Sequence, residues 1–207
     1  MAGSVTMTWY GHACFKAEAG GYSILLDPYG DGKVPGLNPL RQQANQVLCS
    51  HEHEDHNFRE GIRILAWEGA VPWKISWIDT YHDDKEGALR GANRIHILDY
   101  EDLRVVHLGD LGCGLTPDQI KEIGKPDVLM IPVGGYYTIN AAKAKETAGM
   151  LQPRVTIPMH YRSGGYGFDV IGTLDEYTGL CDDIVCYNTN ILTVTEDTKK
   201  QTAVLVL

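Results

Sequence analysis

The sequence has no long hydrophobic run and no excess of positive charge, and both absences restrict what the protein can be. No uninterrupted apolar stretch approaches the roughly 20 residues that a membrane-spanning helix requires. The opening MAGSVTMTWYGHACF lacks the basic residues and the long apolar segment of a signal peptide. With 27 acidic against 18 basic residues, the net charge is −9, so the surface repels polyanions. We therefore expect neither a membrane nor a nucleic-acid partner.

Cysteine is scarce, and the five cysteines show no short paired spacing. Such an odd, unpaired set indicates free thiols and a cytoplasmic location. Cys14, Cys49 and Cys186 lie in apolar, strand-like runs, and we expect them to be buried in the core. Low-complexity segments and charge blocks are missing as well. The 207 residues are therefore expected to form a single domain, 1–207, with a full core.

Strand-like runs dominate the first half of the chain. The dipeptide Gly20-Gly21 separates two of them and predicts a hairpin. A stretch rich in glycine and proline, 31–40, is typical of a loop. The expected strands of this half cover residues 4–10, 13–18, 22–28, 46–50 and 74–82, followed by a hairpin over 92–110.

The second half mixes helices with strands. Thr116 and Pro117 predict the start of a helix, because they suit the N-cap and the first helical position. Short apolar runs near the C-terminus predict terminal strands, of which AVLVL should belong to the core. Helices outside a sandwich of sheets, an α/β architecture, are therefore expected. The remaining expected elements are helices over 116–124, 141–151 and 170–180 and strands over 127–133 and 154–161.

The segment CSHEHEDHN, residues 49–57, carries four good metal ligands: His51, His53, Asp55 and His56. A helical zinc motif would place its histidines at positions i and i+4. Here the first two histidines are two residues apart, so an irregular turn must wrap around the metal. Asp55 and His56 are adjacent and are expected to point to different sides of that turn. This arrangement favours two metal ions over one.

Two neighbouring metal ions need about seven or eight protein ligands, so the cluster needs at least three more. His82, Asp110 and His160 each stand at the end of an apolar strand, in IDTYHDD, VVHLGDLG and VTIPMHYR. Strand ends that converge on one sheet edge would bring them to the cluster. Five histidines with two aspartates favour zinc, iron or manganese, whereas calcium takes oxygen ligands.

Four further strings accompany this ligand set: WYGHACF, LLDP, HLGDLG and IPVGGYYTI. With them, the chain resembles the metallo-β-lactamase superfamily, and within it the cytoplasmic Zn-dependent hydrolases related to the ascorbate-phosphate lactonases. The resemblance runs from about residue 8 to residue 165. It is highly specific for the fold and the metal site and poorly specific for the substrate.

The resemblance implies a fold, a ligand set and a cofactor. The fold would be an αββα four-layer sandwich, of mixed α/β (α+β) class. The cofactor would be two divalent metal ions, with zinc the first choice and manganese or iron as alternatives. By position, His51, His53 and His82 would hold one ion, Asp55, His56 and His160 the other, and Asp110 would bridge them.

One departure from the family pattern is Cys113 in GDLGCGL, where this branch frequently has a histidine. A packing thiol is the main expectation, and a ligand variant or a residue near the substrate is the alternative. His12 presents a similar choice between a hydrogen bond to a metal ligand and a buried structural role. Asp27 either braces the cluster or only terminates its strand. His96 and His107 alternate with apolar residues and are expected in the core.

The expected activity is metal-dependent hydrolysis of a small ester, lactone or phosphate-bearing molecule. Two ions bridged by Asp110 would activate a shared water, and Asp55 would orient it and take its proton. Either His160 or a tyrosine such as Tyr137 would assist the departing oxygen. Each candidate substrate contact could equally be a surface or packing residue. These candidates lie beside the motif segments: Arg90, Asn93, Tyr136, Tyr137 and Arg162.

Two alternatives remain open at this point. One is an iron-dependent redox enzyme of the same fold that handles oxygen or a persulfide. The di-iron oxygen reductases usually carry a glutamate where His53 stands, which argues against that version. The other is a non-catalytic module that a metal stabilises, against which the glycine-rich loops around the ligands argue. Exposed edge strands would also favour a homo-oligomer.

Overall fold

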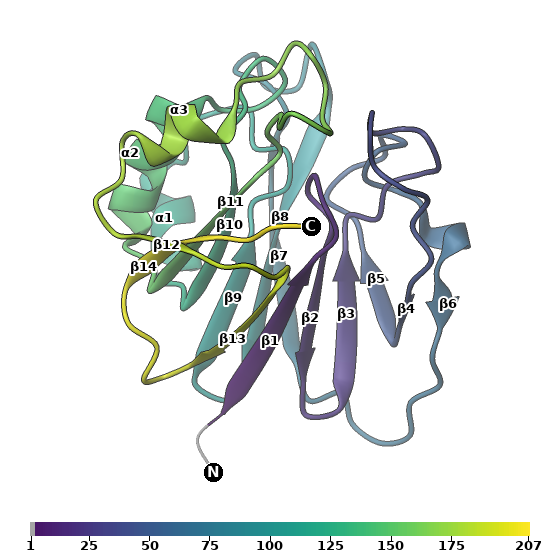
Figure 1. Ribbon diagram of the computed structural model, residues 1–207. Helices are drawn as coiled ribbons and strands as arrows, with labels where there is room; N and C mark the ends of the chain where they lie inside the picture. Colours follow the sequence, from purple (N-terminus) through teal and green to yellow (C-terminus); the bar gives the residue numbers. More distant parts are fainter. Residues whose placement is uncertain (1–2) are drawn as a thin grey trace.

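A computed structural model describes residues 3–207, and two β-sheets face each other at its centre (Figure 1). The five-stranded sheet has the order β13-β1-β2-β3-β5 and the seven-stranded sheet the order β12-β14-β11-β10-β9-β8-β7. The first comprises β1 (Ser4–Trp9), β2 (Phe15–Ala19), β3 (Tyr22–Leu26), β5 (Gln46–Leu48) and β13 (Ile191–Thr195). The second comprises β7 (Lys74–Tyr81), β8 (Ala92–Tyr100), β9 (Leu103–His107), β10 (Val128–Pro132), β11 (Val155–Met159), β12 (Ile184–Cys186) and β14 (Gln201–Val204).

The outer faces of the two sheets have different covers. The helices α1 (Pro117–Ile123), α2 (Ala141–Leu151) and α3 (Leu174–Thr178) lie together beside β10 and β11 (Figure 1). The segment between β3 and β7 packs a second apolar cluster, including Tyr29, Leu40 and Ile62, against the five-stranded sheet. It contains the two-residue strands β4 (Gln43–Ala44) and β6 (Arg63–Ile64) and the 3-10 turn η1 (Arg59–Gly61). The predicted mixed α/β sandwich is confirmed.

Local sequence explains where the helices begin. Thr116 accepts a hydrogen bond from the backbone of Gln119, whose side chain bonds back to Thr116, so the N-cap expected there is present. Asn140 caps α2 through the backbone amide of Lys143. The third helix is shorter than predicted: it begins after Thr173, whose backbone amide donates to the Glu176 side chain at 3.1 Å, and it ends at Gly179. None of the described helices is long and apolar enough to cross a membrane.

The core lies between the two sheets and under the helices. All five residues of β10 and of β11 are buried, as expected for parallel strands covered on both faces. β14 is equally buried between β11 and β12, so the predicted terminal core strand is present, but of AVLVL only Ala203, Val204 and Leu205 are buried, whereas Val206 and Leu207 are exposed. Cys14 and Cys49 are buried as predicted, but the prediction for Cys186 is wrong. Cys186 is exposed because β12 forms the edge of its sheet.

Sheet topology brings the distant strand ends together. β9, β10 and β11 are parallel, and β7 and β9 both run antiparallel to β8, so β7, β9 and β11 point the same way. Each is followed by a predicted ligand: His82 directly after β7, Asp110 shortly after β9 and His160 directly after β11. The cluster segment starts where β5 of the facing sheet ends. The site therefore lies at one edge of the sandwich.

Candidate metal centre

Asp27 braces the turn that carries the histidine cluster. Its carboxylate accepts hydrogen bonds from the Ser50 amide at 2.7 Å, from Ser50 Oγ at 2.6 Å and from His56 Nδ1 at 2.9 Å. Ser50 Oγ has given its only proton to Asp27, so it accepts from His51 Nδ1 at 2.9 Å. Protonated Nδ1 atoms leave the Nε2 lone pairs of His51 and His56 free for a metal. Of the two roles considered for Asp27, the bracing role is present.

Asp110 lies at the centre of the histidines. Its Oδ2 atom is 3.2 Å from His82 Nε2, 3.3 Å from His56 Nε2, 3.1 Å from His160 Nε2 and 4.0 Å from His51 Nε2. The carboxylate is only 2% exposed. Four residues that the sequence places up to about 100 positions apart therefore converge on one oxygen.

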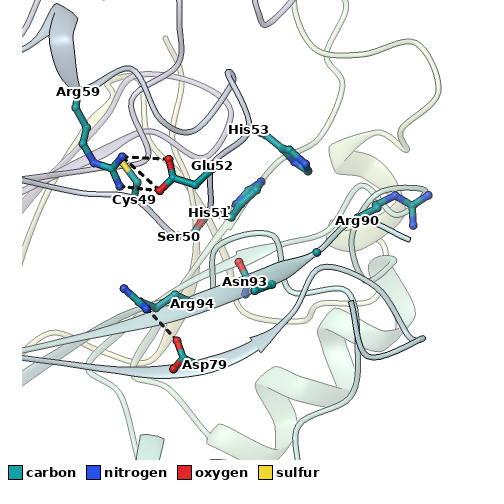
Figure 2. A pocket seen from close by; sticks show the side chains of 12 residues that line it. Cys49, Ser50, His51, Glu52, His53, Arg59, Asp79, Arg90, Asn93 and Arg94 are labelled. Carbon is teal, nitrogen blue, oxygen red and sulfur yellow. Dashed lines mark hydrogen bonds and ion pairs between the residues drawn. The ribbon is translucent and has the colours of Figure 1, made fainter. Parts of the chain in front are cut away.

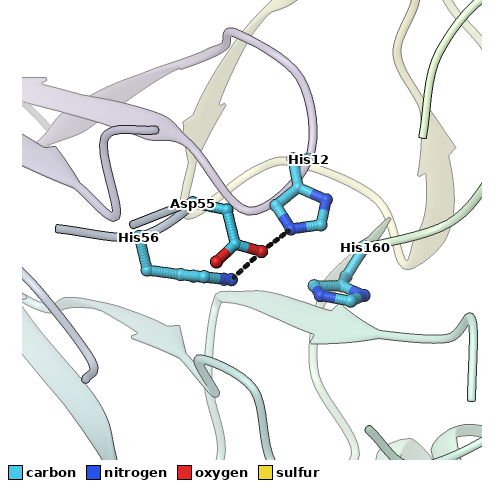
Figure 3. A group of neighbouring side chains, drawn as sticks. All are labelled: His12, Asp55, His56 and His160. Atoms are coloured by element: carbon cyan, nitrogen blue, oxygen red, sulfur yellow. Dashed lines mark hydrogen bonds and ion pairs between the residues drawn. The ribbon is translucent and has the colours of Figure 1, made fainter. Parts of the chain in front are cut away.

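Apart from the bracing set of Asp27, His51 and His56, whose ligand atoms also lie within 4.8 Å of one another, the potential ligands form two groups that meet the same limit. One group is His51, His53 and His82. The other is His12, Asp55, His56 and His160, of which Figure 3 shows the arrangement. Asp110 Oδ2 contacts imidazoles of both groups. All seven predicted ligands are thus brought together.

The local prediction for Asp55 and His56 is wrong. They do not point to opposite sides of the turn, because Asp55 Oδ2 lies 3.6 Å from His56 Nε2 (Figure 3). The amide of His56 donates to the carbonyl of His53 at 2.9 Å, and this tight turn brings the two side chains to the same side. The division into two groups therefore comes from the strand-end residues rather than from the turn itself.

His12 joins the second group, although the sequence left its role open. Its Nε2 atom lies 3.2 Å from Asp55 Oδ2, and its ring centre lies 4.0 Å from that of His160. Its backbone carbonyl also accepts from the amide of His160 at 3.3 Å. His12 therefore touches the second group through both its side chain and its backbone. The only sequence signal was its place in the string WYGHACF.

The charges of the site are strongly coupled. Burial opposes charge on Asp110, but the imidazoles of His160 and His56 hold its pKa well below the usual range. Burial likewise opposes charge on His56, whereas the carboxylates of Asp110 and Asp55 raise its pKa well above its usual value. A proton on His56 thus balances the buried carboxylates in the metal-free protein. A cation at the same place would displace that proton.

The imidazoles of His51, His12 and His53 favour the neutral, metal-binding form. Burial and the neighbouring His56 lower the pKa of His51 to about 3. Burial and His160 lower the pKa of His12 to about 4. Burial and His82 also lower the pKa of His53. Neutral imidazole is the form that binds metal, so these rings need no deprotonation at neutral pH.

The donor set fits a transition-metal centre. Buried polar atoms normally have hydrogen-bond partners, and orphaned ones are costly. Among residues 3–207, several buried atoms of this cluster have none, and they are His51 Nε2, His56 Nε2, His12 Nδ1, His160 Nδ1 and Asp110 Oδ1. Imidazole and carboxylate donors left in this state suit zinc, iron or manganese.

A cavity of about 260 Å³ opens onto the site. Members of both ligand groups line it together with Arg90, Tyr137 and Phe168. The backbone carbonyl of Tyr137 accepts from His82 Nδ1 at 3.1 Å, which leaves His82 Nε2 directed at Asp110. A second cavity, of about 350 Å³, lies beside His51 and His53, and Figure 2 shows its lining.

The remaining predicted residues have varied positions. Arg90 and Tyr137 line the site cavity, and Asn93 lines the second one. Tyr136, which is 63% exposed, and Arg162, whose Nε donates to the carbonyl of Ile171, line neither. Phe168 was missed, because it lies in a loop without a motif.

Three residues outside the ligand groups also have defined positions. Cys113 lies outside both groups, with Sγ 3.8 Å from the carbonyl of Tyr81. His96 and His107 are buried, as predicted.

Comparison with known proteins also indicates a metal-dependent hydrolase. Residues 6–160 match the model of the β-lactamase superfamily domain. A UPF0173 metal-dependent hydrolase of Archaeoglobus fulgidus is 30% identical over 194 residues, with 76% of this chain and 83% of the relative covered. A crystal structure from Thermotoga maritima, titled as a Zn-dependent hydrolase of the metallo-β-lactamase superfamily, is 36% identical. It has a TM-score of 0.76 and covers 97% of this chain and 98% of its own.

A more distant neighbour shares only the fold. CmlA of Streptomyces venezuelae, a diiron β-hydroxylase, is 13% identical, with a TM-score of 0.52 over 75% of this chain and 44% of its own. The family match over residues 6–160 and the two nearer relatives agree with the converged histidine and aspartate residues. The chain belongs to the β-lactamase superfamily, among its metallo-hydrolases.

Proposed function

We propose that the protein hydrolyses a small ester, lactone or phosphate-bearing molecule with two divalent metal ions. The observation that carries this proposal is the position of Asp110 Oδ2, which contacts imidazoles of both ligand groups. A carboxylate shared between two sets of imidazoles suits a pair of cations better than one. Zinc is the first choice, with manganese or iron as alternatives.

The proposed ligands divide as the two groups do. His51, His53 and His82 hold one ion, and Asp55, His56 and His160 hold the other. Asp110 contributes to both. Bound divalent cations supply two effects here: they lower the pKa of water towards neutrality and polarise the oxygen of the scissile bond.

The side chains that face the cavity would perform the remaining tasks. Burial opposes charge on Asp55, but His56 and His12 lower its pKa, so this carboxylate is anionic and can orient the attacking water. His160, whose Nε2 lies 3.1 Å from Asp110 Oδ2 and which lines the same cavity, is the proposed partner of the departing oxygen. The aromatic rings of Tyr137 and Phe168, 5.8 Å apart, would exclude bulk water from an apolar part of the substrate.

Elemental analysis of protein purified without chelators tests the metal assignment. We expect close to two zinc or manganese ions per chain. Asp110→Asn should lower the metal content and reduce hydrolysis of an ester, lactone and phosphodiester panel by about a thousandfold, because several kcal/mol of charge stabilisation depend on the site. Asp197→Asn, a change at an exposed turn, is the matched control and should behave as wild type.

Other outcomes would support the two alternatives. One iron per chain with oxygen uptake would favour redox chemistry, for which the shared fold of the diiron β-hydroxylase provides a precedent. Full metal content without turnover on the whole panel would favour a non-catalytic module. Unchanged turnover in Asp110→Asn would show that the bridging role is wrong.

A further inference from the structure

Arg90 stands in the loop between β7 and β8, on the wall of the cavity that contains the metal ligands. The same side chain also lines the second cavity, as His53 does (Figure 2), and its presence in both linings places it at the boundary between the two cavities. Among residues 3–207, only His53 and Arg90 line both cavities. A ligand that occupies the site cavity on the side of His53 therefore lies near the side chain of Arg90.

The charge of Arg90 is uncompensated. Within the part of the chain that the structure describes, residues 3–207, no carboxylate oxygen lies within 4.0 Å of its guanidinium nitrogens. The other two arginines of the second cavity are paired, Arg94 with Asp79 at 3.0 Å and Arg59 with Glu52 at 3.4 Å. An unpaired guanidinium has five N–H donors, which match the oxygens of a carboxylate or a phosphate group.

The backbone around Arg90 is held rigidly. The Asp83 carboxylate, which is 2% exposed, accepts from the amides of Lys85 at 2.8 Å and Gly87 at 3.0 Å. Its second oxygen accepts from the amides of Leu89 at 3.0 Å and Arg90 at 2.7 Å. Four hydrogen bonds to one side chain fix the loop next to the proposed ligand His82. The backbone at Arg90 is thus fixed by hydrogen bonds to a buried carboxylate.

Aromatic rings further restrict the Arg90 side chain. Its guanidinium carbon lies 5.6 Å from the ring centre of Tyr137 and 6.0 Å from that of Tyr136. Such cation–π contacts leave the N–H groups at the edge of the guanidinium plane available to an anion. The backbone carbonyl of Tyr137 also accepts the hydrogen bond from His82. Arg90, Tyr137 and His82 are therefore adjoining parts of the cavity wall.

We propose that Arg90 binds an anionic oxyacid group, a carboxylate or a phosphate, at the end of the substrate remote from the scissile bond. This inference rests on the proposed hydrolase function and narrows its substrate class. The substrate is a small anionic ester or lactone whose apolar body lies against Tyr137 and Phe168. In a protein with a net charge of −9, one unpaired cation in the wall of the site cavity selects for such an anion locally.

A pair of esters with the same leaving group tests this inference on the metal-loaded protein. 4-Nitrophenyl acetate is neutral, whereas the mono-4-nitrophenyl ester of glutarate carries a remote carboxylate. We expect wild type to have the higher kcat/KM for the glutarate ester. Arg90→Met should lower the ratio of the two kcat/KM values by about 10- to 100-fold, as expected for the loss of a charged hydrogen bond.

Two further variants separate a charge effect from a loss of structure. Arg90→Lys, which keeps the charge without the planar fork, should give an intermediate ratio. Arg94→Met removes a paired arginine of the second cavity and should leave the ratio at the wild-type value. A ratio within twofold of wild type in Arg90→Met, or an equal fall in Arg94→Met, would overturn the inference.

A binding measurement distinguishes this inference from the proposed function. If wild type hydrolyses neither ester, the proposed hydrolase function fails on this substrate class, but binding of glutarate by calorimetry still tests Arg90. Weaker binding in Arg90→Met than in wild type, by the same factor, supports the anion site. Equal affinity in the two proteins overturns it.

Discussion

Asp27 holds His56 through a 2.9 Å hydrogen bond between two side chains that are fully buried. The same carboxylate oxygen accepts from Ser50 Oγ, which in turn orients His51. His51 and His56 belong to different ligand groups. One carboxylate outside the ligand set therefore orients an imidazole in each half of the proposed centre.

Asp27→Asn should weaken metal binding in both halves at once. An amide has one acceptor oxygen in place of two, and its NH₂ group would face His56 Nδ1 or the hydroxyl of Ser50. The expected loss of metal affinity is about 10- to 100-fold, the usual effect of removing such an outer partner. Competition with a chromophoric chelator measures it. If both affinities stayed at the wild-type values, the bracing role would be wrong.

His12→Phe should affect only the second half. The substitution keeps an aromatic ring beside His160 but removes the hydrogen bond to Asp55 Oδ2. We expect the ion held by Asp55, His56 and His160 to dissociate about 10-fold or more readily, whereas the other ion stays bound. Stoichiometry after dialysis against a weak chelator would fall from two towards one. Loss of both ions together would instead indicate a general loss of structure.

Gly112→Ala should disturb the first half. An added Cβ at this glycine would overlap the backbone of His82 and Asp83, so His82 would have to move. Forced overpacking of this kind costs about 1–3 kcal/mol of unfolding free energy. The ion bound by His51, His53 and His82 should be lost first. Gly114→Ala is the matched control, because its nearest atom, Lys143 Cε, lies at 3.6 Å.

Denaturant titration and metal analysis of both glycine variants would check this prediction. Equal stability and equal metal content in the two variants would mean that the loop containing Gly112 can shift without moving His82.

Much of the site could be predicted from the sequence, because its ligands lie at the ends of apolar strands. The sequence alone shows that an apolar run precedes each of His82, Asp110 and His160, and the structure has a strand at each of these places. Local chemistry also predicted the helix that Thr116 caps, since a capping box needs only residues three positions apart.

What could not be predicted depends on contacts between distant residues. The hydrogen bond of His12 spans 43 positions, and no local pattern indicates that its ring reaches Asp55. Cys186 lies in an apolar run like those of the core, but the strand order places β12 at an edge. Edge and central strands have similar sequences when only a few residues are involved. The approach of Asp55 to His56 likewise follows from the conformation of one turn.

His96 should make the metal-free protein less stable in mild acid. It is 3% exposed, and burial chiefly lowers its pKa from 6.5 to about 4. Between these two values the unfolded chain binds a proton that the folded chain does not, so the unfolding free energy falls as the pH falls from 6.5 to 4. From pH 7.5 to pH 5 this one group should lower the unfolding free energy by about 2 kcal/mol.

His96→Leu and His96→Asn should both reduce the change in unfolding free energy between pH 7.5 and pH 5 by about 2 kcal/mol, because neither side chain titrates. Urea unfolding at the two pH values, with a chelator present, measures the difference without a contribution from metal release. The two variants differ in packing and therefore in absolute stability, but the change in unfolding free energy between the two pH values should be reduced in both. A change as large as in wild type in either variant would show that His96 is not the linked group.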